Sequence, residues 1–335
     1  MPTFSPPTFE FIVDRSLSGI RIDSFLIKHL RNYTPWRIQR IVAAGGVRIN
    51  NAVAEQTDRI FKGQTVSVRL IEAPDKLLAP KEMELEIIYQ DEWLIVVNKP
   101  ADLIVHPVGE EQSRTLANGL QHFLDQQTGT KGILRPGMVH RLDRQTSGAI
   151  AVALTYNAHA KLAGEFEASR VSKSYLAIVE GVIERDEGRI DRPIGKARSG
   201  MHVLMSCRPD AVKARNSKTN FRVLERFPNH TLVLARPVTG RNHQIRVHFA
   251  HIGHPLIGDE FYKAHGKFHP NYADLNDGES RTVETGFPIK RHALHAVQLE
   301  FAHPITSRWE TFIAPLPSDF LQTLGKLRKQ QVVQR

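Results

Sequence analysis

The sequence gathers reactive side chains around one aspartate, in the segment HRLDRQTSG at His140–Gly148. Asp143 stands between Arg141 and Arg144, and hydroxyl side chains and a glycine follow. Nearby cations favour the charged form of a carboxylate, so we expect Asp143 to be ionised. Such a group can act as a nucleophile or base in a pocket, or it can be one partner in a structural salt-bridged loop. The grouping alone leaves both interpretations open.

A second group of polar residues is GRNHQIRVH at Gly240–His248. Helical spacing puts Ile245 and Phe249 on a packing face and places Arg246 beside that face. We therefore expect Arg246 to be drawn inward, where a buried guanidinium needs a carboxylate partner. Asp143 is a candidate for that partner.

Signals for cofactor chemistry are missing from the sequence. Four histidines lie close together after residue 242, but no glutamate accompanies them in a zinc-binding pattern, so we predict hydrogen-bonded structural histidines and no metal site. The sequence has no nucleotide-binding glycine loop, no Cys-x-x-Cys and no Gly-x-Ser-x-Gly. An enzyme with this sequence is predicted to work without a nucleotide cofactor, a metal or a thiol.

A basic segment separates two of the expected strands. Lys196–Arg222 has seven Lys and Arg residues, Lys213 and Arg215 among them, and Asp210 as its one acid. We interpret it as an exposed basic loop that contacts phosphates, with a merely solvated hairpin as the alternative.

These side chains need elements to position them, and a chain of 335 residues is long enough for two domains or three. The first module is expected over residues 14–73, with a helix at 21–30. Thr34 and Pro35 suit the start of a second helix, and Gly45 and Gly46 suit its end. The polar side of that second helix offers Arg37 and Arg40 as candidates for binding a polyanion.

The net charge of +10 is unevenly placed along the sequence. Residues 14–72 hold ten Lys and Arg against five Asp and Glu, and residues 326–335 hold four against none. We read residues 74–84 as a linker, 85–320 as a nearly neutral domain and 326–335 as a basic tail. A basic module on a neutral body suggests a polyanionic partner, although a merely soluble basic surface is equally compatible with the charge.

The larger domain is expected to be α+β and rich in antiparallel strands, because no regular alternation of strand and helix occurs. Strand-like patterns fall at residues 85–89, 94–97, 149–154, 173–180, 220–225 and 231–236, and helix-like patterns at 115–124, 157–168 and 242–251. The longest apolar runs are far too short to span a membrane, the N-terminus does not resemble a signal peptide, and Cys207 is the single cysteine. We expect a cytoplasmic protein.

Six segments together resemble the RluA-type pseudouridine synthases. Besides the two described above, they are Asn98–Pro100 with Val105–Pro107, Lys173–Gly181, Gly253–Asp259 and Arg291–Ala296. They occur in the family's order. The first module resembles, more weakly, the small RNA-binding domain named after ribosomal protein S-four, which suits the family's ribosomal-RNA branch.

The resemblance implies a catalytic domain on a mainly antiparallel mixed sheet, and isomerisation of uridine to pseudouridine within RNA without a cofactor. The base would be flipped out, detached at nitrogen 1, turned and rejoined at carbon 5. Asp143 matches the family's catalytic aspartate. Arg246 matches the arginine that pairs with it, Tyr175 the aromatic that packs on the base, and Arg141 a residue that holds or replaces the flipped nucleotide.

The chain departs from the family pattern at Asp102, where glycine is usual, and aspartate tolerates the positive φ such a turn requires better than most residues. The leading hypothesis is an enzyme acting as a monomer on large-subunit ribosomal RNA. A transfer-RNA enzyme and a non-catalytic RNA-binding assembly factor are the alternatives.

Overall fold

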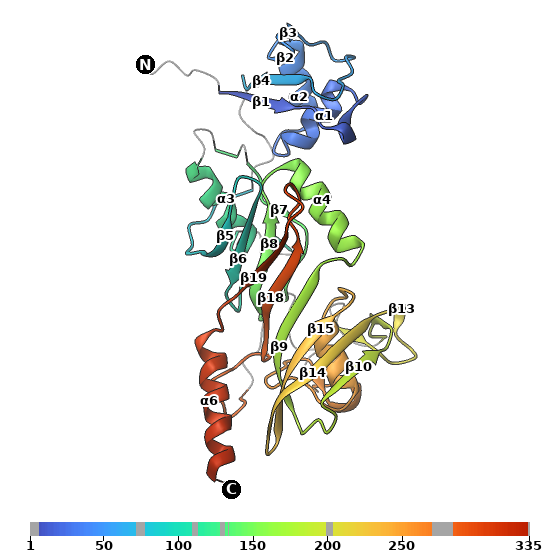
Figure 1. Cartoon of the computed structure of the whole chain (residues 1–335), viewed down its shortest axis with the longest axis vertical. Helices are drawn as coiled ribbons and strands as arrows, with labels where there is room; N and C mark the ends of the chain where they lie inside the picture. Colours follow the sequence, from blue (N-terminus) through green and yellow to red (C-terminus); the bar gives the residue numbers. More distant parts are fainter. Residues whose placement is uncertain are drawn as a thin grey trace.

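The computed structural model describes residues 7–71, 78–108, 113–127, 131–132, 134–198, 204–269 and 284–333. It has a small N-terminal α+β unit at one end of an elongated body, which is built on a single long sheet (Figure 1).

The N-terminal unit packs two helices against a sheet of order β1-β4-β2-β3. Its elements are β1 (Thr8–Ile12), α1 (Ile22–His29), α2 (Pro35–Ala43), β2 (Val47–Ile49), β3 (Ala52–Val53) and β4 (Thr65–Arg69), with a 3-10 turn at Arg15–Leu17. Thr34 accepts the N–H of Arg37 and Pro35 opens α2, as predicted. The expected start at residue 14 omits β1, which pairs along its length with β4 and places Phe9 and Phe11 on the core.

The unit is docked onto the body through the start of α4 (Tyr156–Glu167). Lys28 Nζ donates to Tyr156 Oη at 3.2 Å. The ring of His29 lies among the rings of Phe11, Phe25 and Tyr156. Tyr156 thus joins the hydrophobic core of the N-terminal unit.

In the described residues, ten strands form the main sheet, with the path β10-β14-β15-β9-β18-β8-β6-β5 and with β19 and β7 paired at its sides. All pairs are antiparallel except β18 with β8, so the predicted α+β class and mainly antiparallel mixed sheet are confirmed. The strands are β5 (Glu86–Gln90), β6 (Leu94–Lys99), β7 (Gly137–Met138), β8 (Ser147–Ala153), β9 (Ser172–Glu180), β10 (Glu187–Asp191), β14 (Lys218–Phe227), β15 (His230–Pro237), β18 (Leu294–Ala302) and β19 (Trp309–Ile313).

The centre of the sheet is closely packed where β8 meets β18. Every residue of β8 is buried, and Gly148 faces Ala296 so closely that a Cβ at Gly148 would lie 2.3 Å from the Ala296 carbonyl oxygen. Gly148 also has φ +119°, which side-chain-bearing residues rarely adopt. Glycine therefore permits the contact that joins the two halves of the sheet.

Helices flank the sheet: α3 (Leu116–Gln127), α4, α5 (Gln244–His251) and α6 (Ser318–Val333). None of the described helices combines the length and the apolar character that crossing a membrane requires.

The C-terminal expectation is wrong in part. Residues 326–333 continue α6, whose Phe320, Leu324 and Leu327 pack into the core, so the domain does not end at 320. Arg328 is paired with Glu225 at 2.8 Å. Apolar spacing upstream of the basic residues therefore makes this segment a docked helix, and residues 334–335 lie outside the described part.

The basic segment 196–222 is not a simple loop. It contributes to a three-stranded sheet of β11 (Ile194–Lys196), β12 (Met205–Ser206) and β13 (Val212–Arg215), and then enters β14. A small hairpin of β16 (Tyr262–Lys263) and β17 (Lys267–Phe268), linked by a 3-10 turn at Ala264–Gly266, lies beside α5. In the expected linker, residues 74–77 are outside the described residues, while Ala79 and Lys81 hydrogen-bond to Asn118 at the start of α3.

Candidate active site

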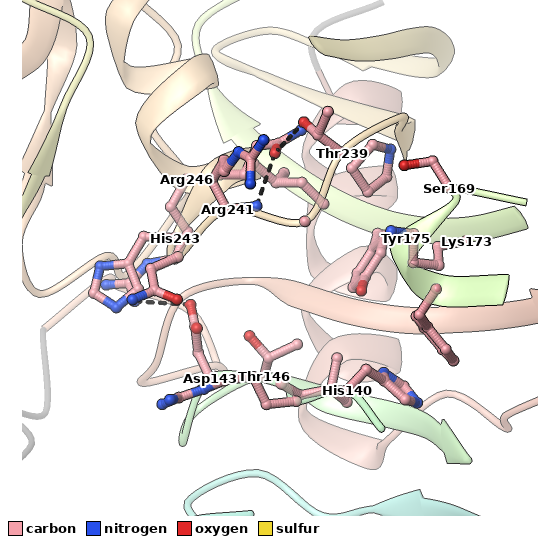
Figure 2. Close-up of a pocket in the computed structure, with 18 of the residues that line it drawn as sticks. His140, Asp143, Thr146, Ser169, Lys173, Tyr175, Thr239, Arg241, His243 and Arg246 are labelled. Carbon is pink, nitrogen blue, oxygen red and sulfur yellow. Dashed lines mark hydrogen bonds and ion pairs between the residues drawn. The ribbon is translucent and has the colours of Figure 1, made fainter. Parts of the chain in front are cut away.

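A cleft of about 630 Å³ opens where the loop before β8, strand β9 and the segment leading into α5 converge. Asp143, Tyr175 and Arg246 all line it (Figure 2). Arg141 and Arg215 line it as well. The structure thus brings together five of the residues that the sequence singled out. Arg37 and Arg40 do not line it; they lie on α2 in the N-terminal unit.

Asp143 and Arg246 are in contact, as the sequence suggested. Arg246 Nη1 donates to Asp143 Oδ2 at 3.2 Å. The guanidinium is 2% exposed and the carboxylate 23% exposed, so the arginine lies beneath the aspartate and the aspartate faces the cleft. Such a pair keeps a partly accessible carboxylate in one position.

Two further carboxylates, to which the sequence analysis gave no role, hold Arg246. Asp259, which is 0% exposed, accepts from Nε at 2.8 Å and from Nη2 at 2.9 Å. Glu260 is 4.0 Å from Nη2. Asp259 also accepts the backbone N–H groups of Phe261 and Tyr262. Because Asp259 occupies two of the guanidinium nitrogens, it fixes the orientation in which the third faces Asp143.

Electrostatics around Asp143 favour its ionised form. Burial alone would raise the pKa of the carboxyl, but the charges of His243, Arg246 and Arg141 and the hydrogen bond from Arg246 outweigh burial and lower it. Of these, Arg246 carries its charge at every working pH, because Asp259 and Asp143 raise its own pKa against the effect of burial. The part that persists at neutral pH therefore comes from the two arginines, of which Arg246 is the one in contact with the carboxylate.

The loop that carries Asp143 is braced from two sides. The ammonium of Lys99, at the end of β6, donates to the carbonyls of Pro100, Leu103 and Arg144 at 2.7–2.9 Å. Arg291 donates to the carbonyl of Gln145 at 2.8 Å and is itself paired with Asp319 of α6. These contacts leave the loop little freedom to shift.

Lys99 has an unusual environment for a lysine. Its side chain is fully buried, and burial lowers its pKa to about 7 despite the nearby charges of Asp143 and Asp102. The three carbonyl acceptors compensate part of the cost of that burial. Asp102 follows in the turn with φ +62°, as expected at this departure from the family pattern, and pairs with Arg144 at 2.7 Å.

His140 anchors the beginning of the same loop. Its Nε2 accepts the N–H of Ala151 in β8 at 2.9 Å, and its ring stacks on Phe166 of α4 with centroids 4.4 Å apart. Burial lowers the pKa of His140 to about 3, so the ring is neutral and able to accept.

Tyr175 lies on β9, on the wall of the cleft across from Asp143 and Thr146 (Figure 2). Burial and the charge of Asp143 raise its pKa, so the hydroxyl keeps its proton at neutral pH. Lys173, two positions earlier on the same face, also lines the cleft, and burial lowers its pKa. An aromatic face beside cations suits a planar base attached to a phosphate chain.

The turn into α5 completes the cleft wall. Gln244 accepts from Thr239 Oγ1 and from the backbone N–H of Arg241, and donates to the Lys218 carbonyl at 2.9 Å. The predicted helix at 242–251 begins at 244, because His243 has left-handed backbone angles. The sequence could not show this, since histidine carries no turn signal.

The remaining basic candidates are on the surface. Lys213 and Arg215 lie on the fully exposed β13, and Arg215 reaches the edge of the cleft. Arg40 is exposed and stacks over the ring of Trp36, 4.6 Å from its centroid. Among the residues with described positions, no group of three or more His, Cys, Asp or Glu is arranged to hold a metal ion.

The site is a braced aspartate that faces an aromatic side chain across a basic cleft on a mainly antiparallel sheet, an arrangement that the resemblance to the pseudouridine synthases predicts. Comparisons agree. The sequence pattern of the family described as RNA pseudouridylate synthase matches residues 93–251. The chain is 39% identical over 319 residues to the ribosomal large subunit pseudouridine synthase D of Pseudomonas aeruginosa, covering 94% of each protein.

A Bacillus subtilis protein named as the uncharacterized RNA pseudouridine synthase YlyB is 38% identical over 92% of this chain and 94% of its own length. The solved structure of human RNA pseudouridylate synthase domain containing 4 is similar, with a TM-score of 0.55 and 26% identity over 72% of this chain and 93% of that one. The chain belongs to the RluA-type branch of the RNA pseudouridine synthases.

Proposed function

We propose that this enzyme converts uridine to pseudouridine in large-subunit ribosomal RNA, with Asp143 as the reacting carboxylate. The observation that carries the proposal is the placement of Asp143, ionised and held by Arg246 at the edge of a cleft whose opposite wall is Tyr175. The names of relatives such as the Pseudomonas aeruginosa enzyme support the choice of RNA.

The other cleft residues have roles that follow from their positions. Arg246 holds Asp143 and keeps it charged. Tyr175 packs on the flipped uracil, as aromatic side chains do with unstacked bases. Arg141 is exposed at the rim, where it can occupy the gap the uridine leaves or bind the phosphate beside it. Extruding the base costs a few kcal/mol, which these contacts offset.

Binding of the RNA chain is assigned to two basic surfaces. Lys213 and Arg215 continue from the cleft along β13. Arg37 and Arg40 lie on α2 of the N-terminal unit, which we propose is an RNA-binding domain of the S-four type. The exposed Trp36, 62% accessible beside Arg40, offers a face on which a base can stack.

The reaction is an isomerisation and needs no oxidant, reductant or carried group. We propose that the enzyme acts as a monomer. The proposed ribosomal substrate places the enzyme in the cytoplasm.

The test is Asp143→Asn, which removes the charge while keeping the side-chain shape. Arg246 retains Asp259, so the variant is expected to fold and to bind RNA. Pseudouridine formation, read by carbodiimide-adduct primer extension on total ribosomal and transfer RNA, is expected to stop. The control is Asp102→Asn, because asparagine also tolerates positive φ. Activity retained in Asp143→Asn would refute the proposed role of Asp143. If the unmodified enzyme forms pseudouridine in transfer RNA alone, the substrate is transfer RNA and not ribosomal RNA.

The phosphate contacts have their own test. Lys213→Ala and Arg215→Ala are each expected to weaken RNA binding and to reduce the slope of log affinity against log salt by about 1. Arg328→Ala is the control, because Arg328 is already paired with Glu225. Slopes equal to that of the unmodified protein would show that β13 does not contact RNA.

A further inference from the structure

His243 has an unusual backbone for its residue type. It stands at the N-cap position of α5 with φ 54° and ψ 20°, the left-handed region, and its side chain makes no capping hydrogen bond. That conformation costs a residue with a β-carbon roughly 1–2 kcal/mol, and glycine or asparagine would adopt it more readily. A strained residue in a cleft suggests that its side chain has another use.

The imidazole of His243 is held in one orientation. Its ring lies nearly parallel to that of Phe261, with an interplanar angle of 17° and centroids 5.9 Å apart. Nδ1 is 2.7 Å from Tyr262 Oη. Stacking fixes the plane of the ring, and the hydroxyl fixes its rotation.

The hydrogen bonds also favour one position for the imidazole proton. Tyr262 Oη accepts the backbone N–H of Met205 at 3.1 Å. The tyrosine O–H is then free to donate to His243 Nδ1, which is its one acceptor among the described residues. With Nδ1 accepting, a neutral imidazole carries its proton on Nε2.

Nε2 is the ring nitrogen available to a ligand. It makes no hydrogen bond with any described residue, and it is not fully buried. Because His243 lines the cleft, this nitrogen is accessible from it. Asp143, Arg246, Asp259 and Arg141 are the charged groups that act on it. Burial outweighs the two carboxylates and lowers its pKa to about 4, which leaves the ring neutral at neutral pH.

We propose that His243 donates a hydrogen bond from Nε2–H to a carbonyl oxygen of the flipped uracil and so stabilises the negative charge that forms when the base is detached. The inference rests on the proposed function, which places the uridine beside Asp143. As the bond from ribose C1′ to N1 breaks, its electron pair leaves with the base and spreads onto the carbonyl oxygens. A pre-oriented donor in a water-poor site is effective against such a charge.

His243 keeps its proton throughout. After the base turns, C5 bonds to C1′ through a ring electron pair, the C5 proton departs and N1 gains a proton, so the overall reaction stays an isomerisation. A neutral donor suits this role better than an imidazolium, which would pair with Asp143 before any substrate binds.

The test compares His243→Asn and His243→Gln with the unmodified enzyme in single-turnover assays on target RNA. Asparagine accepts the left-handed backbone but is too short to replace Nε2, and we expect its rate to fall about 100- to 1,000-fold with RNA affinity little changed. Glutamine places an N–H near the position of Nε2 and should recover at least tenfold of that loss. His265→Asn is a matched control, because His265 has φ 59° and lies outside the cleft.

A second readout separates charge stabilisation from a structural role. RNA with 5-fluorouridine at the target presents a base that carries negative charge more easily, so the defect of His243→Asn in consuming it should be several-fold smaller. Equal defects on both RNAs, or a His243→Asn rate within threefold of the unmodified enzyme, would overturn the proposal. Asp143→Asn distinguishes the two levels: if that variant stays active the proposed function fails, whereas an inactive Asp143→Asn with an active His243→Asn refutes the inference alone.

Discussion

Replacing Arg246 by lysine keeps the charge but removes the geometry on which the site depends. The guanidinium uses Nε and Nη2 for Asp259, at 2.8 and 2.9 Å, and Nη1 for Asp143, at 3.2 Å. A lysine has one nitrogen and cannot bridge both carboxylates in that way. We expect the ammonium to stay with Asp259, whose two backbone donors already hold it in place, and Asp143 to lose its contact.

The magnitudes follow from these contacts. Losing the charge-assisted bond to Asp143 costs about 1.5–3 kcal/mol of folding free energy. Arg246→Met would cost about 3–5 kcal/mol, because Asp259 and Glu260 would remain buried without a cation. A misplacement of Asp143 by about 1 Å is enough for a roughly 100-fold fall in kcat. In both variants the pKa of Asp143 rises toward its usual value, since Arg246 lowers it now. The acid limb of the rate profile should then move to higher pH, because Asp143 must be ionised to react.

Urea unfolding and single-turnover pseudouridine formation across pH would measure the two effects. Arg170→Lys is the matched control: Arg170 also makes a two-pronged contact, with Glu165, but on the surface, where such pairs contribute little to stability. An Arg246→Lys enzyme whose kcat stays within threefold of the unmodified protein, with an unmoved acid limb, would refute the reasoning.

Two further predictions concern stability. Gly148→Ala should destabilise the fold by about 3 kcal/mol or more, because the new methyl would meet the Ala296 backbone at 2.3 Å and φ is +119°. Gly164→Ala, with open space around it in α4, should instead stabilise the fold by about 0.5–1 kcal/mol. Equal melting temperatures for the two variants would contradict this prediction. Burial lowers the pKa of His29 from 6.5 to about 4, so the unfolded chain binds more protons in that window and stability falls as pH drops through it. His29→Leu should remove up to about 3 kcal/mol of the loss in unfolding free energy at pH 4. Unfolding curves between pH 7 and 4 measure this, and the same pH dependence in the variant and the unmodified protein would contradict the prediction.

Local signals in the sequence were sufficient where neighbouring residues decide the structure. Thr34 and Pro35 mark the start of α2, and Gly45 follows its end, as predicted. The pattern in Gly240–His248 correctly predicted that Arg246 is buried. Such local signals could not predict contacts between segments that are far apart in the sequence. The basic residues after 325 suggested a tail. In the structure, Phe320, Leu324 and Leu327 pack into a core formed with other segments, and the basic residues continue the same helix.

The second carboxylate on Arg246 shows the same limit at the site. Asp259 was part of a family-like motif, yet its spacing from Arg246 gave no sign that the two would meet, because the contact depends on how the segment between α5 and β16 folds back onto the helix. Lys99 and Arg291 likewise belonged to recognised motifs, but the hydrogen bonds by which they brace the Asp143 loop run to backbone carbonyls, which a pattern of side chains does not encode.

The position of β18 has a consequence for the order in which the enzyme matures. Asp143 precedes β8 in one half of the sheet, while Tyr175 and Arg246 belong to the other half, and β18 is the strand between β8 and β9 that joins them. A ribosome making this chain releases β18 after all three residues have emerged. The site therefore forms by late, long-range pairing, which is slow relative to local folding. A nascent chain stalled before residue 294 should bind no substrate in the cleft, and protease resistance of segment 139–146 should arise only once β18 has been released.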